Sequence, residues 1–208
     1  MDDINFNKIW DTLYVLVNCF KPKTYQDCQA MYSFFETLKF IIPDPSMRYL
    51  LMNFMSNNPI QLRPCSCTEH IKWVAELNSY ICRNMRKTPK DTYDTICKIY
   101  DPRKITKTKW GNSVWYFIHY TAINQPRFLT KDIALSYKEM MLSLTVLLPC
   151  EMCRGHLKQH LQDFPIDNYL RTNESLFEWT FQLHNKVNVS LNKPVMNYNQ
   201  ARALYSPK

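Results

Sequence analysis

Prolines divide this chain into short segments that carry the apolar spacing of amphipathic helices. Twelve prolines occur in 208 residues. Between them, apolar residues recur three or four positions apart, and alternating β patterns bounded by turn pairs are missing. We therefore predict an all-α protein of short helices. They are expected at residues 6–18, 25–41, 46–57, 68–88, 91–100, 110–123, 130–148, 150–163, 174–191 and 197–205.

Glycine is nearly absent, which restricts how a nucleotide could be bound. Gly111 and Gly155 are the only two glycines. P-loops and G-x-G-x-x-G turns need several glycines to bring the backbone close to phosphate. A flavin or nucleotide would therefore have to be held by another architecture.

Charge and hydropathy argue against nucleic-acid and membrane partners. The net charge is +8, but lysines and arginines are scattered singly or in pairs, which indicates a generally basic surface. No window of about 18 uninterrupted apolar residues exists, so no transmembrane helix is expected. The acidic start MDDINFNKIWDTLYVL is unlike a signal peptide. Eight cysteines are many for a reduced compartment, which points to thiol chemistry or to an oxidising setting.

The two halves of the chain resemble each other. IIPDPSMRYLLMNFMSNNPI (41–60) aligns without a gap with LLPCEMCRGHLKQHLQDFPI (147–166), and Pro43 then matches Pro149. Order, spacing and proline positions agree along the rest of the chain. We predict two tandem five-helix modules, at residues 1–105 and 106–208.

The first module lacks the polar residues that make the second one chemically interesting. Asp44 and Met47 stand where Cys150 and Cys153 stand in the second copy. Likewise, Asn78 and Cys82 occupy the positions of His184 and Asn188. We therefore expect the site in the second module and treat the first as degenerate, serving as a dimerisation or docking surface.

The stretch LLPCEMCRGH (147–156) contains a C-x-x-C pair directly after Pro149. A proline suits a helix start, which would place Cys150 and Cys153 in the first turn. There, unpaired backbone N–H groups and the helix dipole stabilise thiolates. Arg154 adds positive charge. Such a pair can open and close a disulfide readily.

A zinc site is the alternative for the same stretch. Cys150, Cys153, His156 and His160 are spaced C-x2-C-x2-H-x3-H, and zinc accepts all of these side chains. Zinc modules usually separate the cysteine pair from the histidine pair by about a dozen residues, however. A zinc-binding helical interaction protein without a flavin remains the competing hypothesis.

Two further pairs lie four residues apart and so share a helix face: Trp115 with His119, and His184 with Asn188. Taken singly, each is more often a core residue than a ligand. Together, an indole, two imidazoles and an amide facing one interior would suit a planar aromatic cofactor.

Three segments resemble the signatures of the Erv/ALR flavin-linked sulfhydryl oxidases: WGNSVWYFIHYTAINQP, PCEMC and LHNKVNVSLNKPVMNY. They occur in the family's order and spacing across most of 107–205. The degenerate first module resembles the two-module enzymes of large DNA viruses of the baculovirus type. The family pattern departs at Asn112, where an arginine is common, and no cysteine follows Cys153.

The resemblance implies a helical bundle that binds FAD beside the C-x-x-C pair. Cys150 would exchange with a substrate thiolate, and Cys153 would pass two electrons to the flavin, which reduces dioxygen to hydrogen peroxide. The activity implied is that of an FAD-dependent thiol oxidase acting on protein dithiols, with a homodimer as the expected assembly. A viral enzyme would work in the host cytoplasm, the nucleus or the virion. The implied flavin-binding residues are Gly111, Ser113, Trp115, His119, His184, Val187, Asn188, Lys193 and Tyr198.

The other six cysteines leave alternatives open. Cys65 and Cys67 lie in an expected loop and could relay oxidising equivalents to Cys150, or each could pair separately or stay free. Structural disulfides are plausible between two further pairs. These are Cys19 with Cys28, and Cys82 with Cys97.

Overall fold

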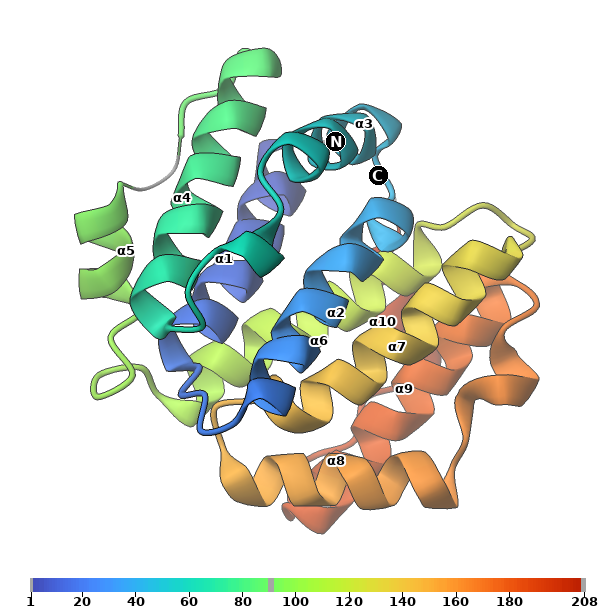
Figure 1. The fold of residues 1–208 in the computed structure, drawn as a ribbon. Coiled ribbons are helices and arrows are strands. Elements are labelled where there is room, and N and C mark those ends of the chain that lie inside the picture. The colour runs from blue at the N-terminus through green and yellow to red at the C-terminus, as the bar shows by residue number, and fades with distance from the viewer. Residues whose placement is uncertain (1, 90–91, 207–208) are drawn as a thin grey trace.

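The computed structural model describes residues 2–89 and 92–206, and in these ranges the secondary structure is helical apart from one isolated β-bridge (Figure 1). This confirms the all-α prediction. The helices of the first half are α1 (Asp3–Cys19), α2 (Tyr25–Ile41), α3 (Pro45–Asn57), the 3₁₀ helix η1 (Ile60–Leu62), α4 (Cys67–Asn84) and α5 (Tyr93–Ile99). Those of the second half are α6 (Lys107–Ile123), α7 (Lys131–Leu147), α8 (Glu151–Asp163), η2 (Ile166–Tyr169), α9 (Asn173–Ser190) and α10 (Tyr198–Tyr205).

Side-chain acceptors at the helix starts explain why the predicted boundaries agree closely with the structure. At every α-helix in the described ranges, the N-cap side chain accepts a backbone N–H of the first turn. The caps are Asp2, Thr24, Asp44, Ser66, Thr92, Thr106, Thr130, Cys150, Thr172 and Asn197. The helix expected over 91–100 begins at Tyr93, and residue 91 lies outside the described ranges.

The helix predicted over 68–88 extends too far at its C-terminal end, because α4 ends at Asn84. Arg86 adopts a φ of 54°, in the left-handed region. The N–H groups of Arg86 and Lys87 then turn back to the carbonyls of Arg83 (3.4 Å) and Cys82 (2.8 Å), which forms a Schellman closure. Glycine usually occupies this position, so the sequence contains no obvious stop signal.

Several local structures recur 106 residues later in the chain. The bounds of α2 and α7 and those of α4 and α9 keep this spacing. The indole N–H of Trp73 donates to the carbonyl of Asn58 (2.8 Å), and that of Trp179 donates to Phe164 (3.1 Å). A Schellman closure also ends α9, where Asn192 has a φ of 53°. The two halves thus share N-caps, Schellman helix ends and an indole-to-carbonyl hydrogen bond at corresponding positions.

The two halves pack against each other through their first two helices. α2 lies along α7 and α1 packs on α6, as Figure 1 shows for α2 and α7. The rings of Phe34 and Phe117 meet 6.1 Å apart in this contact. The hydroxyl of Thr12 donates to the carbonyl of Ser113 (2.8 Å). One continuous core therefore holds α6 in place, and α6 carries part of the candidate site. No helix within the described ranges is long and apolar enough to span a membrane.

A disulfide joins α2 to the segment before α4. It links Cys28, which is buried, to Cys65, which is exposed. Because the two cysteines are 37 residues apart, chain-entropy arguments give a stabilisation of about 4 kcal/mol. The pairing of Cys19 with Cys28 is therefore wrong, and Cys82 and Cys97 are not bonded to each other but are free thiols. Folding brings Cys28 next to the loop that carries Cys65, and the spacing of the cysteines in the sequence does not indicate this contact.

We expect His70→Phe to raise the free energy of unfolding by about 1 kcal/mol at pH 7, because a buried polar group without a partner is costly. His70 is fully buried, stacks on Phe20 (5.7 Å between centroids), and neither ring nitrogen has a hydrogen-bond partner among the described residues. Urea denaturation would measure the change. The exposed His156→Phe, on α8, is the control and should give no gain. A loss of stability in His70→Phe would contradict the prediction.

Candidate active site

The C-x-x-C pair forms a disulfide at the start of α8. Cys150 is the N-cap, and its Sγ accepts the backbone N–H of Cys153 at 3.2 Å. Both sulfurs therefore lie in the first turn, as the sequence predicts, where the helix dipole favours a thiolate. The guanidinium of Arg154 donates to the carbonyl of Leu148 (2.7 Å) and fixes the approach to the pair.

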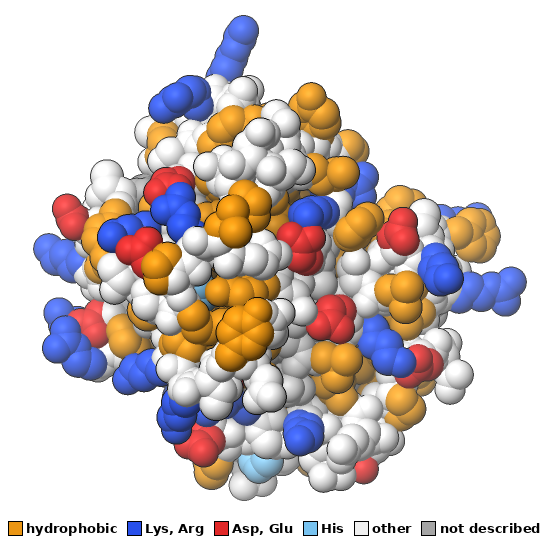
Figure 2. Space-filling view, in the orientation of Figure 1, with side chains coloured by type: hydrophobic (Ala, Val, Ile, Leu, Met, Phe, Trp, Pro, Cys, Tyr) orange, Lys and Arg blue, Asp and Glu red, His pale blue; other side chains and the backbone are white. Residues whose placement is uncertain are grey.

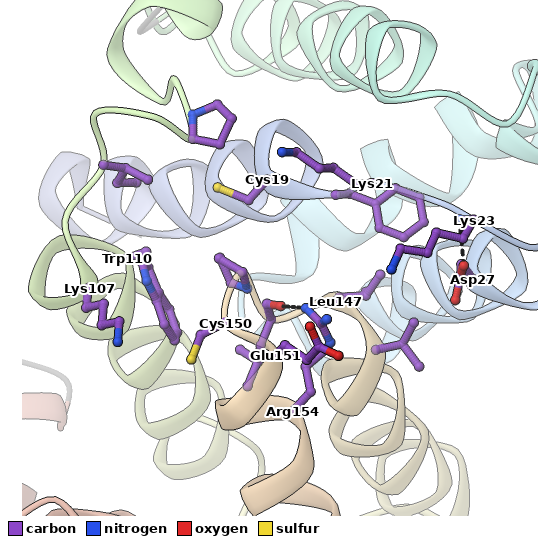
Figure 3. Close-up of a pocket in the computed structure, with 16 residues that line it drawn as sticks. Cys19, Lys21, Lys23, Asp27, Lys107, Trp110, Leu147, Cys150, Glu151 and Arg154 are labelled. Atoms are coloured by element: carbon purple, nitrogen blue, oxygen red, sulfur yellow. Dashed lines mark hydrogen bonds between the residues drawn. The ribbon is translucent and has the colours of Figure 1, made fainter.

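A cavity of about 520 Å³ opens beside Cys150 (Figure 3). Cys150, Glu151 and Arg154 from α8 line it together with Trp110 of α6, whereas Cys153 is not among its lining residues. Figure 3 shows the end of α1, with Cys19, on the opposite side of this space. Cys150 is thus the cysteine of the pair that lines this cavity.

Trp115, His119 and His184 stack as parallel flat rings between α6 and α9. The indole of Trp115 lies 4.0 Å from the imidazole of His184 at an interplanar angle of 7°. His119 stacks on the same indole, with centroids 5.6 Å apart. His119 is buried, but Trp115 and His184 are only partly buried. Three of the four side chains expected to face one interior therefore meet, whereas no contact within the described ranges brings the Asn188 amide to these rings.

Hydrogen bonds determine which nitrogens of the two imidazoles carry protons. The hydroxyl of Thr180 donates to the carbonyl of Phe177 (2.8 Å), so at 2.9 Å it accepts the Nδ1–H of His119. The Nε2 of His119 is then an acceptor, and it receives the Nδ1–H of His184 at 2.9 Å. As a result, the Nε2 of His184 is left as an acceptor at the end of the chain of hydrogen bonds.

Burial keeps both imidazoles neutral, as this arrangement requires. Burial, with a smaller contribution from the positive charge of Lys193, lowers the pKa of His184 to about 4. Burial likewise holds the pKa of His119 well below its usual value, with a smaller contribution from His184. A protonated His184 would have no acceptor left to offer a ligand. The field of Lys193 at His184 also shows that a cation lies near the ring stack.

The segment that follows α9 is held against that helix by Asn185, the residue after His184. Its side-chain amide donates to the carbonyl of Met196 (3.1 Å), and its amide oxygen accepts the N–H of Met196 (3.0 Å). The carbonyl of Asn188 accepts the N–H of Lys193 at 2.8 Å. These bonds fold the 191–197 loop so that Lys193 is held beside α9.

The remaining predicted flavin-binding residues differ in how they are engaged. A Cβ added at Gly111 would meet no heavy atom within 4 Å, so space is open beside it. Ser113 lies two residues further along α6, and its hydroxyl donates to the carbonyl of Lys109 (3.2 Å). Val187 and Asn188 are partly buried on α9. The hydroxyl of Tyr198 donates to the carboxylate of Glu174 (3.4 Å), which also pairs with Arg202, so Tyr198 contributes to packing against α9.

The candidate shuttle pair is not joined internally. Cys65 is bonded to Cys28, and the thiol of Cys67 donates to the carbonyl of Val17 (3.3 Å). Burial raises the pKa of Cys67 above its usual value. The shuttle role of Cys65 and Cys67 stays a prediction, and a relay through Cys65 would have to use the bond to Cys28.

Two residues of the site were missed from the sequence. Thr180 fixes the tautomer of His119, and Asn185 anchors the loop that carries Lys193. Thr180 lies four residues before His184, so the helical spacing that selected the other members would have included it. Asn185 follows His184 directly, and only its contact with a distant backbone reveals its role.

The corresponding surface of the first half is closed. Asn78 and Cys82, which match His184 and Asn188, are fully buried, and the thiol of Cys82 contacts the amide oxygen of Asn78 at 3.8 Å. Burial raises the pKa of Cys82 to about 11, so it stays a neutral thiol. In the first half, buried side chains therefore occupy the position that is partly exposed around His184 and Asn188 in the second half.

Comparisons with known proteins match the second half. The profile of the Erv1 / Alr family covers residues 112–206. A protein named FAD-linked sulfhydryl oxidase from African swine fever virus is 32% identical over 99 residues, which are 46% of this chain and 79% of that protein. The chain belongs to the Erv1 / Alr family. A probable FAD-linked sulfhydryl oxidase of Acanthamoeba polyphaga mimivirus is 34% identical over 45% of this chain and 66% of its own length. For the FAD-linked sulfhydryl oxidase ERV1 of Arabidopsis thaliana, the identity is 33%, over 44% of this chain and 47% of that protein.

The donor set of this Erv1 / Alr member suits FAD better than a metal. Flat rings with an exposed side, a neutral imidazole acceptor, a nearby lysine and open space beside Gly111 match the aromatic and phosphate parts of a dinucleotide. In contrast, no three His, Cys, Asp or Glu side chains of residues 2–89 and 92–206 converge as metal ligands. The geometry gives the zinc alternative no support.

Proposed function

We propose that the chain is an FAD-dependent thiol oxidase that forms disulfides in protein dithiols and passes the electrons to dioxygen, giving hydrogen peroxide. The observation that carries the proposal is the Cys150–Cys153 disulfide at the start of α8, inside the segment that matches the Erv1 / Alr family. Bound FAD would accept two electrons from the reduced cysteine pair and deliver them to dioxygen. The residues proposed to hold it are Gly111, Ser113, Trp115, His119, His184, Val187, Asn188, Lys193 and Tyr198.

The cysteine pair carries the exchange with substrate. A substrate thiolate attacks the Sγ of Cys150, and Cys153 leaves as a thiolate in the first turn of α8, where the dipole stabilises it. A second substrate thiol then displaces Cys150 from the mixed disulfide. The substrate thus loses two electrons and two protons, and the cysteine pair is left reduced.

A visible absorption spectrum tests the proposal. The purified chain should show flavin absorption near ~450 nm that dithiothreitol bleaches under argon and air restores. Oxygen consumption with the same reductant should yield hydrogen peroxide. A chain that binds no flavin, or binds one that dithiols do not reduce, would refute the oxidase function.

Asn185→Ala is expected to weaken FAD binding about tenfold, because two hydrogen bonds that hold the Lys193 loop are lost. Flavin fluorescence titration of the apoprotein would measure this, and its melting temperature would show whether the fold is affected. Gln200→Ala, at an exposed position of α10, is the control and should bind FAD like the unmodified chain. Equal affinities for all three would show that the loop does not contribute.

We also propose that the chain consists of two modules, 1–105 and 106–208, of which only the second binds FAD. The N-caps, Schellman helix ends and indole hydrogen bonds that recur at a spacing of 106 residues support this division. The buried positions of Asn78 and Cys82 support it as well. A binding stoichiometry of one FAD per chain is expected.

A homodimer is part of the proposal. Leu135 and Leu142 are 55% and 47% exposed, and they share one face of α7 because they lie seven residues apart. Figure 2 shows hydrophobic side chains interspersed with charged ones over the face formed by α2 and α7. The molar mass in solution should be that of two chains, and Leu142→Arg should reduce it to that of one chain.

The relatives of this chain in large DNA viruses support the proposal of a viral enzyme that acts in the host cytoplasm, the nucleus or the virion.

A further inference from the structure

The cavity beside Cys150 is built from both halves of the chain. One wall is the end of α1 and the corner leading to α2, with Cys19, Lys21 and Lys23. The opposite wall is formed by α6 and the start of α8, with Lys107, Trp110 and Cys150. Its volume of about 520 Å³ is in the range of ligand-binding clefts. The first half therefore borders the cavity that exposes Cys150.

Positive charge predominates around the opening. Lys21, Lys23 and Lys107 are exposed and have no ion pair among the described residues, and Figure 3 shows them around the cavity. Arg154 uses its guanidinium on a backbone carbonyl and so keeps its charge. The acidic residues on the lining are Asp27 and Glu151.

The two acidic residues on the lining are ionised but offset only half of this charge, because four cationic side chains line the cavity. The carboxylate of Asp27 accepts the backbone N–H groups of Lys23 (2.7 Å) and Thr24 (2.8 Å) and serves to cap α2. Those bonds hold the pKa of Asp27 below its usual value. Glu151 lies in the first turn of α8, where it faces the positive end of the helix dipole. The lining therefore keeps an excess of positive charge, which suits an anionic partner.

We propose that this cavity is the docking site for an acidic, extended segment of a protein dithiol substrate, whose thiolate reaches Cys150. The inference rests on the proposed oxidase function. The substrate sulfur bonds to the Sγ of Cys150 as the Cys150–Cys153 bond breaks, and the second substrate sulfur then bonds to the first as Cys150 leaves. Two electrons pass from the substrate to the cysteine pair, and the protons go to solvent.

Cys19 does not compete for the incoming substrate, although it lines the same cavity. Burial raises its pKa to about 11, with a further contribution from Cys67, so it remains a protonated thiol near neutral pH. Because only thiolates exchange rapidly, a substrate in the cavity reacts at the disulfide. Cys19 is thus a neutral part of the wall.

The test compares two dithiol peptides that share their cysteines but are flanked by glutamates in one and by lysines in the other. The FAD-loaded full chain should oxidise the acidic peptide with the higher kcat/KM, by about tenfold at low salt, and the preference should shrink at high salt. In Lys21→Glu/Lys23→Glu the ratio of the two values should fall to about one or invert. Lys131→Glu, at the opposite end of α7 from the cavity, is the control and should retain the preference of the unmodified chain.

The possible results separate this inference from the proposed function. No preference in the unmodified chain, or an unchanged ratio in the double variant, would overturn the docking site while oxygen consumption with dithiothreitol persists. If dithiothreitol is not oxidised by the unmodified chain, the oxidase function itself fails. A ratio that falls in Lys131→Glu as much as in the double variant would show a general charge effect and would also overturn the site.

Discussion

Replacing Cys153 with serine is expected to lower the rate of dithiol oxidation by about 10³-fold or more while FAD stays bound. Cys153 is the leaving sulfur when substrate attacks Cys150, and a serine hydroxyl can neither form the disulfide nor carry its electrons. The ring stack of Trp115, His119 and His184 includes neither cysteine, so flavin binding should be retained. Stopped-flow absorption would show a flavin that dithiothreitol no longer bleaches.

The two cysteines should fail in different ways. Cys153→Ser leaves the thiol of Cys150 in the cavity, so the disulfide-linked dimer of a single-cysteine peptide should exchange with it. One peptide thiol is released, and the mixed disulfide left on Cys150 is detected by intact-mass measurement. Cys150→Ser should trap much less, because Cys153 does not line the cavity. Cys97→Ser, at a free thiol of α5, is the control and should retain full activity. Equal trapping by both active-site variants would contradict the assignment of Cys150 as the outer sulfur.

Helix positions were predictable because local chemistry decides them. Thr24 and Asp27 form a capping box at the start of α2, and Pro45 marks the start of α3, so boundary signals and apolar spacing agree there. The end of α4 was not predictable in this way. Arg86 enters the left-handed region without being glycine, and the local Schellman hydrogen bonds close the helix there without a sequence signal.

Part of the candidate site could be predicted from the sequence, because some of its contacts follow helical spacing. Trp115 and His119 share a face of α6 by their four-residue separation, and the structure stacks them. The bond from His119 to His184 joins residues 65 positions apart, and it was the resemblance to the Erv/ALR family that placed both at one flavin. Asn185 could not be recognised, because its partner is a backbone group that lies near it only after the loop has folded.

The spacing of cysteines in the sequence did not predict all of the disulfides. The short intervals from Cys65 to Cys67 and from Cys19 to Cys28 suggested local pairs, yet Cys28 is bonded to Cys65. That bond depends on how α2 packs against the segment before α4, which is a tertiary property. For Cys150 and Cys153 the outcome differs, because one helix turn brings them together whatever the rest of the chain does.

Acidification is expected to destabilise the apoprotein through the buried imidazoles. The unfolded pKa of a histidine is about 6.5, and that of His184 in the fold is about 4. Between these values the unfolded chain binds a proton that the folded chain does not, so the free energy of unfolding falls as pH falls. For His184 alone this amounts to about 2 kcal/mol at pH 5 and about 3 kcal/mol below pH 4. His119, shifted in the same direction, adds to the loss.

Urea denaturation at pH 7 and pH 5 measures this effect. The difference in unfolding free energy between the two pH values should shrink in His184→Gln by about 2 kcal/mol, whatever the variant's stability at pH 7. His156→Gln, at an exposed position of α8, is the control and should keep the pH dependence of the unmodified chain. FAD should dissociate in the same pH range, because protonation of His184 removes its Nε2 acceptor and adds a charge beside Lys193. A pH dependence that is unchanged in His184→Gln would show that the fold does not lower the pKa of this imidazole.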